Sequence, residues 1–448
     1  MSNSLTRFKP GSIKELITIA LPLGFASMSF HLMLFFDRIL LSRYSMDAMN
    51  AAGSVSIMIF AFSFFGISVA SIAEVFAGQN YGAKKYQQLA RPVWQMIWFS
   101  LMLIIPFYLI GILLDDFIVH GNLGDEAKEY FRFSMNMAFI SILNAALISF
   151  YVARGKTKFI TINTVFGSIL NMALAYWLIF GVKGYLEPQG LMGAAYATTI
   201  AMVVQCATLF GGMLSASNRR LFNTGDYRLD WPLFKQCIKV GLPNGVGHFV
   251  EICGWAVINY YLCGLGHHFI TIYTLTQNFI IVCAFYTDAL QKAIVAIASN
   301  AIGADKILTI NKTLNSAIKL QFIMTAVLAL PLIIFATETL KIFISDPAHY
   351  YIIPLATMSL IGCWIYFLVD GITYTVASIL LAGGDTTFLM ITNSVFSWAF
   401  AVLPTLLFIK EDSHPSAIWV SIMPLYAFAL LGAYYWRYKG GKWEHKVI

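Results

Sequence analysis

The chain has 448 residues, of which 59% are apolar and only 11% are charged, whereas a soluble globular protein carries about 25% charged residues. This composition excludes a soluble globular protein and predicts an integral membrane protein. The formal net charge of +7 does not imply a nucleic-acid partner, because the basic residues fall mostly in loops on one side of the predicted membrane domain.

Apolar stretches of about twenty residues or more recur along the whole chain, and this length suits membrane-spanning helices rather than the shorter strands of an outer-membrane barrel. Inside a bilayer the backbone must satisfy its own hydrogen bonds, so the stretches are predicted to be helical. The first is too long for a secretory signal and is expected to be retained. The twelve predicted spans are residues 15–41, 47–80, 93–114, 127–152, 159–182, 189–214, 232–264, 268–301, 314–344, 350–382, 387–409 and 416–436.

Lysine and arginine residues lie mainly in every second loop. They concentrate in the N-terminal segment, in the loops after the even-numbered spans and in the C-terminal segment. Because basic loops stay on the cytoplasmic side, both termini are predicted to be cytoplasmic. Short loops and the lack of a signal sequence favour a bacterial inner membrane. The alternate loops hold only Arg43, Lys128, Lys183, Lys341 and Lys410.

The polar connection at residues 215–230 divides the chain into two groups of six spans, residues 1–220 and 221–448, and several features recur across it. Groups with an even number of spans enter the membrane from the same side, which predicts two pseudo-symmetric six-helix bundles around a central cavity, as in transporters. The recurring features, at offsets of 221 and then 229 residues, are Leu21-Pro22 with Leu242-Pro243, Gly82 with Gly303, and Gly155 with Gly384.

Acidic residues occur inside several spans. A carboxylate at the centre of a membrane helix costs roughly 2.5 to 3.5 kcal/mol and by default marks an ion or proton path. From the helical rise, Glu251, Asp288 and Asp370 all lie roughly 18 to 21 Å from the inner ends of their spans. Acids at a common depth can share a cation or exchange a proton. We therefore expect Glu251 and Asp370 to form a Na⁺ site for which protons compete.

Each acid also has a second interpretation, in which a local partner neutralises it. For Asp288 that partner is Lys292, one helical turn further on, whereas no basic residue stands three or four positions from Glu251 or Asp370. A membrane histidine or tyrosine can serve either helix packing or the ion path. The other groups open to both interpretations are Asp37 beside Arg38, Glu74, His248 and Tyr366.

Four segments, in their order and spacing, resemble the multidrug and toxic compound extrusion (MATE) transporters over nearly the whole chain. The resemblance implies twelve helices in two lobes that form a V, and export of amphiphilic, often cationic compounds against Na⁺ or H⁺. The segments are IALPLGF in the first span, GQNYGAKK after the second, VGLPNGVGHFVE in the seventh, and VDGITYTVASILLAGGDTT from the tenth into the eleventh.

Carried over by position, the resemblance assigns Asp37 to the acid of the family's first span, Glu251 to that of the seventh and Asp370 to that of the tenth. Tyr366 lies one turn before Asp370, and Asn171 matches the asparagine of the fifth span. This set is similar to the NorM-type members, in which the acids serve ion coupling.

The chain also departs from the family pattern. Ala175 stands where many relatives carry an acid one turn after the fifth-span asparagine, which puts a complete proton site in the first lobe in doubt. Ile297 stands where the family often has an arginine, near the end of the eighth span. Glu74, Asp288 and Lys292 lie outside the general pattern, so the substrate is expected to be unusual.

The predicted function is secondary antiport of organic cations by a monomer that needs no cofactor beyond Na⁺ or H⁺ and binds no nucleic acid. No phosphate loop, zinc pattern or nucleophile elbow indicates an enzyme. The alternatives are a lipid-linked precursor flippase of the same superfamily and a non-transporting membrane sensor. The candidate ion-coupling or substrate residues are Asp37, Asn171, Glu251, Asp288, Tyr366 and Asp370.

Overall fold

The computed structural model describes residues 5–118, 124–343, 347–444 and 446–448, and within them the chain is almost entirely helical. The first part of the chain contains α1 (Ile13–Tyr44), α2 (Met46–Ala70), α3 (Ala73–Gly82), α4 (Ala90–Met102), α5 (Ile104–Leu113), α6 (Asp115–Ile118), α7 (Gly124–Met137), α8 (Phe139–Val152), α9 (Thr157–Phe180) and α10 (Gly190–Met213). The second contains α11 (Ala216–Phe222), α12 (Trp231–Leu265), α13 (His267–Gly303), α14 (Ile307–Ala329), α15 (Ala336–Phe343), α16 (Ile353–Ala382), α17 (Thr386–Phe396), α18 (Leu403–Phe408) and α19 (Met423–Lys439).

The membrane spans match the sequence prediction closely. Among the described residues, ten helical stretches are long and apolar enough to cross a membrane, and α13, bent by 43°, supplies another. The 35-residue α12 covers the remaining predicted span, although it is not among the stretches that meet this criterion. Some predicted spans consist of two helices in succession, such as α2 with α3 and α4 with α5. The prediction of an all-helical membrane protein is therefore confirmed.

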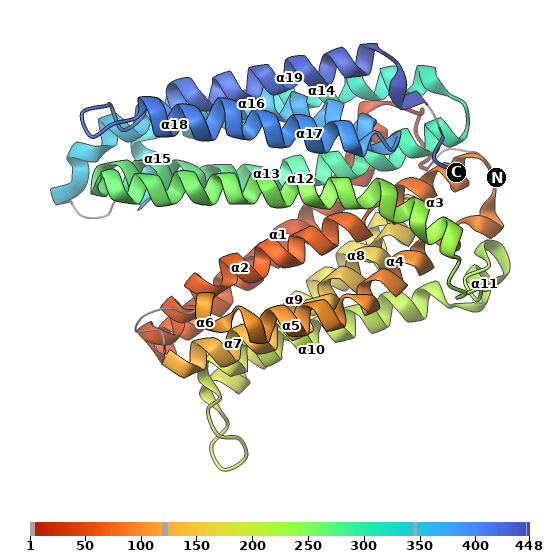
Figure 1. Cartoon of the computed structure of the whole chain (residues 1–448), viewed down its shortest axis with the longest axis horizontal. Helices are drawn as coiled ribbons and strands as arrows, with labels where there is room; N and C mark the ends of the chain where they lie inside the picture. The colour runs from red at the N-terminus through yellow and green to blue at the C-terminus, as the bar shows by residue number, and fades with distance from the viewer. Residues whose placement is uncertain (1–4, 119–123, 344–346, 445) are drawn as a thin grey trace.

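The helices form two elongated bundles, shown in Figure 1. Helices α1 to α10 make the N-terminal bundle, and α12 to α19 make the C-terminal bundle. The bundles meet at the end where both chain termini lie, which we call the terminal end, and they diverge toward the opposite end (Figure 1). The exact division of the chain at residues 220 and 221 stays a prediction.

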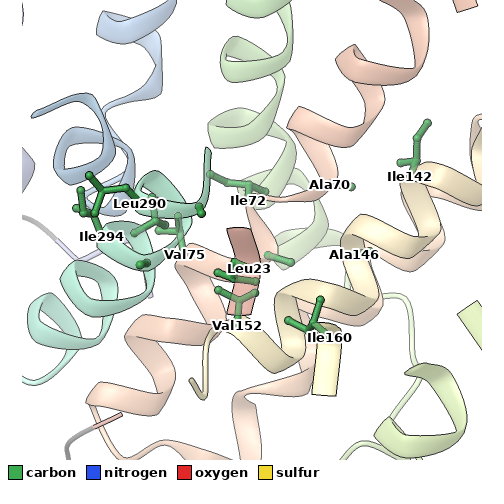
Figure 2. Close-up of a cluster of buried hydrophobic side chains, with 14 of the residues drawn as sticks. Leu23, Ala70, Ile72, Val75, Ile142, Ala146, Val152, Ile160, Leu290 and Ile294 are labelled. Atoms are coloured by element: carbon green, nitrogen blue, oxygen red, sulfur yellow. The ribbon is translucent and has the colours of Figure 1, made fainter. Parts of the chain in front are cut away.

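The hydrophobic core is continuous between the bundles near the terminal end. Figure 2 shows Leu23, Ile72 and Val75 of the N-terminal bundle in one buried cluster with Leu290 and Ile294 of α13. Because α1 and α3 both pack on α13, these apolar contacts fix the position of α13 between the bundles.

A pair of glycine contacts lets the backbones of the two bundles approach closely. A Cβ atom on Gly82 of α3 would lie 1.9 Å from the backbone oxygen of Asn300, and one on Gly303 of α13 would lie 2.0 Å from that of Gln79. The offset from Gly82 to Gly303 is 221 residues, and so is the offset from Gln79 to Asn300. The two contacts are therefore one contact repeated about a pseudo-two-fold axis.

Hydrogen bonds reinforce this junction. The Gln79 side chain is fully buried, and its amide nitrogen donates to the Ala382 carbonyl (2.8 Å) while its amide oxygen accepts from the Val447 backbone N–H (2.9 Å). Lys446 forms a 2.6 Å salt bridge with Asp305, in the loop after α13. The C-terminal segment thus ties α3 of one bundle to α13 and α16 of the other.

We expect Gly82→Ala and Gly303→Ala to lower the free energy of unfolding by similar amounts, about 1 to 3 kcal/mol each, because each methyl group would meet a backbone carbonyl. Thermal unfolding of the purified protein in detergent measures the loss. Gly211→Ala and Gly432→Ala are matched helix controls, since a Cβ at either position meets nothing within 4 Å. Unchanged melting of both junction variants would contradict the symmetric contact.

Candidate ion-coupling site

Glu251 is the centre of a polar cluster inside the C-terminal bundle. It lies on α12 with 9% of its surface exposed. Its carboxylate accepts hydrogen bonds from Asn393 Nδ2 of α17 (2.8 Å) and from Trp255 Nε1 (3.4 Å). His248 Nδ1, one helical turn earlier on α12, lies 3.5 Å from Oε2 of Glu251, the oxygen that also accepts from Asn393. Among the described residues, these donors hold the carboxylate in place without a salt bridge to lysine or arginine.

Helix α16 supplies the second acid. Tyr366, Asp370 and Tyr374 follow one another at intervals of four residues and therefore share a helix face. The Tyr366 hydroxyl lies within hydrogen-bonding reach of Asp370, and the negative charge of Glu251 acts on Asp370. Tyr374 and Asn393 line the same cavity. The structure thus brings together three predicted site residues, Glu251, Tyr366 and Asp370.

A fourth helix, α19, closes the cluster. The Tyr426 hydroxyl of α19 donates to Asn393 Oδ1 at 3.3 Å. Two carboxylates within range of each other's charge, with His248 as the titratable base beside Glu251 and no lysine or arginine salt bridge to Glu251 among the described residues, form a site that favours an added cation or proton. Within the described part of the chain, no group of three or more His, Cys, Asp and Glu residues is placed to hold a metal ion. The carboxylate, amide and phenol oxygens instead suit a hard cation such as Na⁺.

Asp288 lies apart from this cluster. It is exposed on α13, and the charged or titratable groups that act on it are Lys292, His31 of α1 and His248. The helical rise gives the depth of a residue along its span, but it does not give the direction in which the side chain points. Asp288 is connected to the cluster through the charge of His248, while its other charged or titratable neighbours, Lys292 and His31, are not among the groups that bond Glu251.

Asp37 and Asn171 form a second polar cluster, in the N-terminal bundle. Asp37 is 8% exposed and lies within hydrogen-bonding reach of Asn171. Asn171 Nδ2 donates to Thr198 Oγ1 of α10 at 3.0 Å. Asp37 Oδ1 and Asn171 Oδ1 have no hydrogen-bond partner among the described residues. Ala175 is fully buried one turn further along α9, so among these residues Asp37 is the single acid.

Sequence reasoning missed three residues that complete these clusters, Asn393, Tyr426 and Thr198. Each is a polar side chain inside a predicted span, and such residues commonly bond neighbouring helices. Their position in a span could have marked them as candidates. The partner that each would find depends on helix packing, which the sequence pattern does not specify.

Comparison with known families decides what kind of protein carries these clusters. A family model described as MatE matches residues 22–177 and residues 243–405, which together make up more than half of the chain. The chain belongs to the MatE family. The two matches begin at residues 22 and 243, again an offset of 221, which agrees with the repeated features and with the paired glycine contact.

Relatives of this MatE protein extend over nearly its full length. It is 23% identical over 417 residues to the "Probable multidrug resistance protein YoeA" of Bacillus subtilis (strain 168), covering 90% of this chain and 88% of that protein. It is 20% identical to the "Probable multidrug resistance protein NorM" of Synechocystis sp. (strain ATCC 27184 / PCC 6803 / Kazusa), covering 95% and 94%.

A solved structure shares the fold. It is described as the outward-facing conformation of a multidrug resistance MATE family transporter, and it superposes with a TM-score of 0.84 over 96% of both chains at 17% identity. The likeness confirms the twelve-helix architecture in two bundles. Because the family consists of membrane transporters, the expectation that the chain is not an enzyme is also confirmed.

We expect Asn393→Leu to lower the free energy of unfolding by about 1 to 3 kcal/mol, because it leaves the buried Glu251 carboxylate without its shortest hydrogen bond. Thermal unfolding at neutral pH measures the effect. Adding Glu251→Gln to this variant should recover part of the loss, since the charge is then removed. Tyr426→Phe, which removes only the 3.3 Å bond to Asn393, should cost less. A larger loss in Tyr426→Phe than in Asn393→Leu would contradict this order of contacts.

Proposed function

We propose that the protein is a secondary antiporter that exports amphiphilic, cationic organic compounds from a bacterial cell in exchange for Na⁺ or H⁺. One observation carries the proposal. Glu251 and Asp370 act on each other's charge inside the C-terminal bundle, and among the described residues neither forms a salt bridge with lysine or arginine. Two carboxylates at membrane depth that lack a lysine or arginine counter-charge are unfavourable unless a cation or proton binds them.

The coupling step follows from the residues around this pair. A cation at Glu251 and Asp370 neutralises charge between α12, α16 and α17, and so changes the packing that these helices prefer. His248 beside Glu251 also contacts the N-terminal bundle, where the ring of Phe64 on α2 meets it edge to face at 5.4 Å. A change in ion occupancy at Glu251 therefore affects His248 and, through it, the contact between the bundles. Transport requires that the ion bind the two conformations with different affinity, and this contact supplies a path for that difference.

The substrate would bind between the bundles. Asp288 offers an accessible carboxylate there, and the ring of Phe285 on the same helix lies 4.4 Å from that of His31 on α1. An acid beside aromatic rings suits an organic cation with a flat apolar body. The names of the relatives, which refer to multidrug resistance, agree with this class. A lipid-linked precursor flippase would favour a more basic surface than Lys292 alone provides.

We also propose the orientation in the membrane. The basic loops favour cytoplasmic termini, and with the termini there the end where the bundles meet is cytoplasmic and the bundles diverge toward the outside (Figure 1). In this orientation the described conformation faces outward. The protein would act as a monomer in the inner membrane, with no nucleic-acid partner and no cofactor other than the coupling ion.

We expect Glu251→Gln and Asp370→Asn each to reduce ion-driven dye transport at least about tenfold, the equivalent of about 1.4 kcal/mol of lost ion binding. Transport of a fluorescent organic cation into proteoliposomes measures the rate, with a Na⁺ gradient and a pH gradient imposed separately. Glu187→Gln is the control, because Glu187 is exposed in the loop between α9 and α10. Wild-type rates in both cluster variants would rule out this coupling site.

A further inference from the structure

The charge of Lys292 of α13 acts on two carboxylates that belong to different bundles. Asp288 lies one turn before it on the same helix, and both side chains are exposed. Glu74 lies on α3 of the N-terminal bundle and is 6% exposed. Its Oε1 atom has no hydrogen-bond partner among the described residues, and the charge that acts on it is that of Lys292. The positive charge of one lysine thus acts on two acids.

The register of α3 against α13 places Lys292 beside Glu74. The two helices pack together, and a Cβ on Gly78 would lie 2.1 Å from the Ser299 hydroxyl. Glu74 is one turn before Gly78, a rise of about 6 Å, and Lys292 is two turns before Ser299, a rise of about 10.5 Å. The four-carbon stem of lysine spans the remaining difference of about 4.5 Å. Figure 2 shows Val75 of α3 in the same cluster as Leu290 and Ile294 of α13.

The lysine and Asp288 face the other bundle rather than lipid. Phe285, Ala289 and Lys292 follow one face of α13. On that face Phe285 contacts His31 of α1, and a Cβ on Gly24 of α1 would lie 3.5 Å from the Ala289 side chain. Contact of a charged side chain with acyl chains is strongly unfavourable. The exposed Asp288 and Lys292 therefore lie in a solvent-accessible space at the boundary between the bundles.

We propose that Lys292 is a positioning residue of the transport cycle, whose ammonium group is shared between Asp288 of its own helix and Glu74 of the opposite bundle. The distance from Lys292 to Asp288 is fixed by the helix. Lys292 is close to Glu74 only while α3 and α13 stay in contact at the terminal end. The pair with Glu74 therefore stabilises the conformation that is closed at that end, and Asp288 competes with it for the lysine.

This sharing gives the two acids opposite effects. Glu74→Gln removes the contact between the bundles and shifts the population toward separation of the terminal end, by about fivefold or more if the coupling is of the usual size for a conformational switch. Asp288→Asn removes the competitor and shifts the population toward closure. Lys292→Met shifts it in the same direction as Glu74→Gln, and Glu74→Gln/Lys292→Met goes no further than Lys292→Met alone.

Electron paramagnetic resonance distances test these shifts. Spin labels replace Lys85 and Lys306, which lie in the loops after α3 and α13, in a background with all six cysteines substituted. The protein is measured in lipid nanodiscs without substrate or ion gradient. Asp288→Asn is also measured in a Gln79→Leu background, which loosens the terminal end so that both conformations are populated. Asp47→Asn is the control, since Asp47 is exposed at the far end of α2.

Shifts of the same sign for Glu74→Gln and Asp288→Asn, or no shift for Glu74→Gln, would overturn the proposal. Glu74→Asp is the second variant should Glu74→Gln not fold, and its shorter side chain should open the terminal end to a smaller extent. The inference rests on the transport cycle proposed above, but the measurement uses no ion gradient and leaves Glu251 and Asp370 unchanged. Its failure therefore leaves the role of Glu251 and Asp370 standing, and loss of that role in dye transport leaves this measurement unaffected.

Discussion

The interaction on which the structure depends is the burial of two carboxylates without a lysine or arginine counter-charge among the described residues. Glu251 is held by Asn393 and Trp255, and Asp370 by Tyr366, while no lysine or arginine of the described residues forms a salt bridge with either acid. A carboxylate in a low-dielectric interior gains most when an opposite charge arrives. The cluster is therefore a site whose energy depends on occupancy, which an antiporter needs and a static scaffold does not.

The junction at the terminal end is where a change in ion occupancy would alter the contact between the two bundles. Gly82 and Gly303 let the backbones of α3 and α13 touch, and Gln79 bonds Ala382 and Val447. These contacts are short-range and uncharged, so they are lost together when the helices separate. The lysine shared by Glu74 and Asp288 acts over a longer range at the same boundary. Apolar packing thus fixes where the bundles meet, and the charges set how readily they part.

Hydropathy in the sequence was sufficient to predict the twelve spans, because the bilayer imposes both their length and their helical state. The offset of 221 residues between Gly82 and Gly303 also predicted the repeat, and the structure shows its physical basis in a contact that only glycine allows. Helical rise gave the depth of Asp288, but its direction was not predictable, since direction depends on how α13 packs on α1. Asn393, Tyr426 and Thr198 were missed for the same reason, because each is defined by a partner on another helix.

The central claim is that a cation or proton occupies the Glu251 and Asp370 cluster and leaves when the substrate is bound. The most direct measurement is the release of ²²Na⁺ and of protons from the purified, lightly buffered protein when a saturating organic cation is added. The account predicts that one of the two ions is released from the wild-type protein and that neither is released from Glu251→Gln/Asp370→Asn. Undiminished release from the double variant would contradict it.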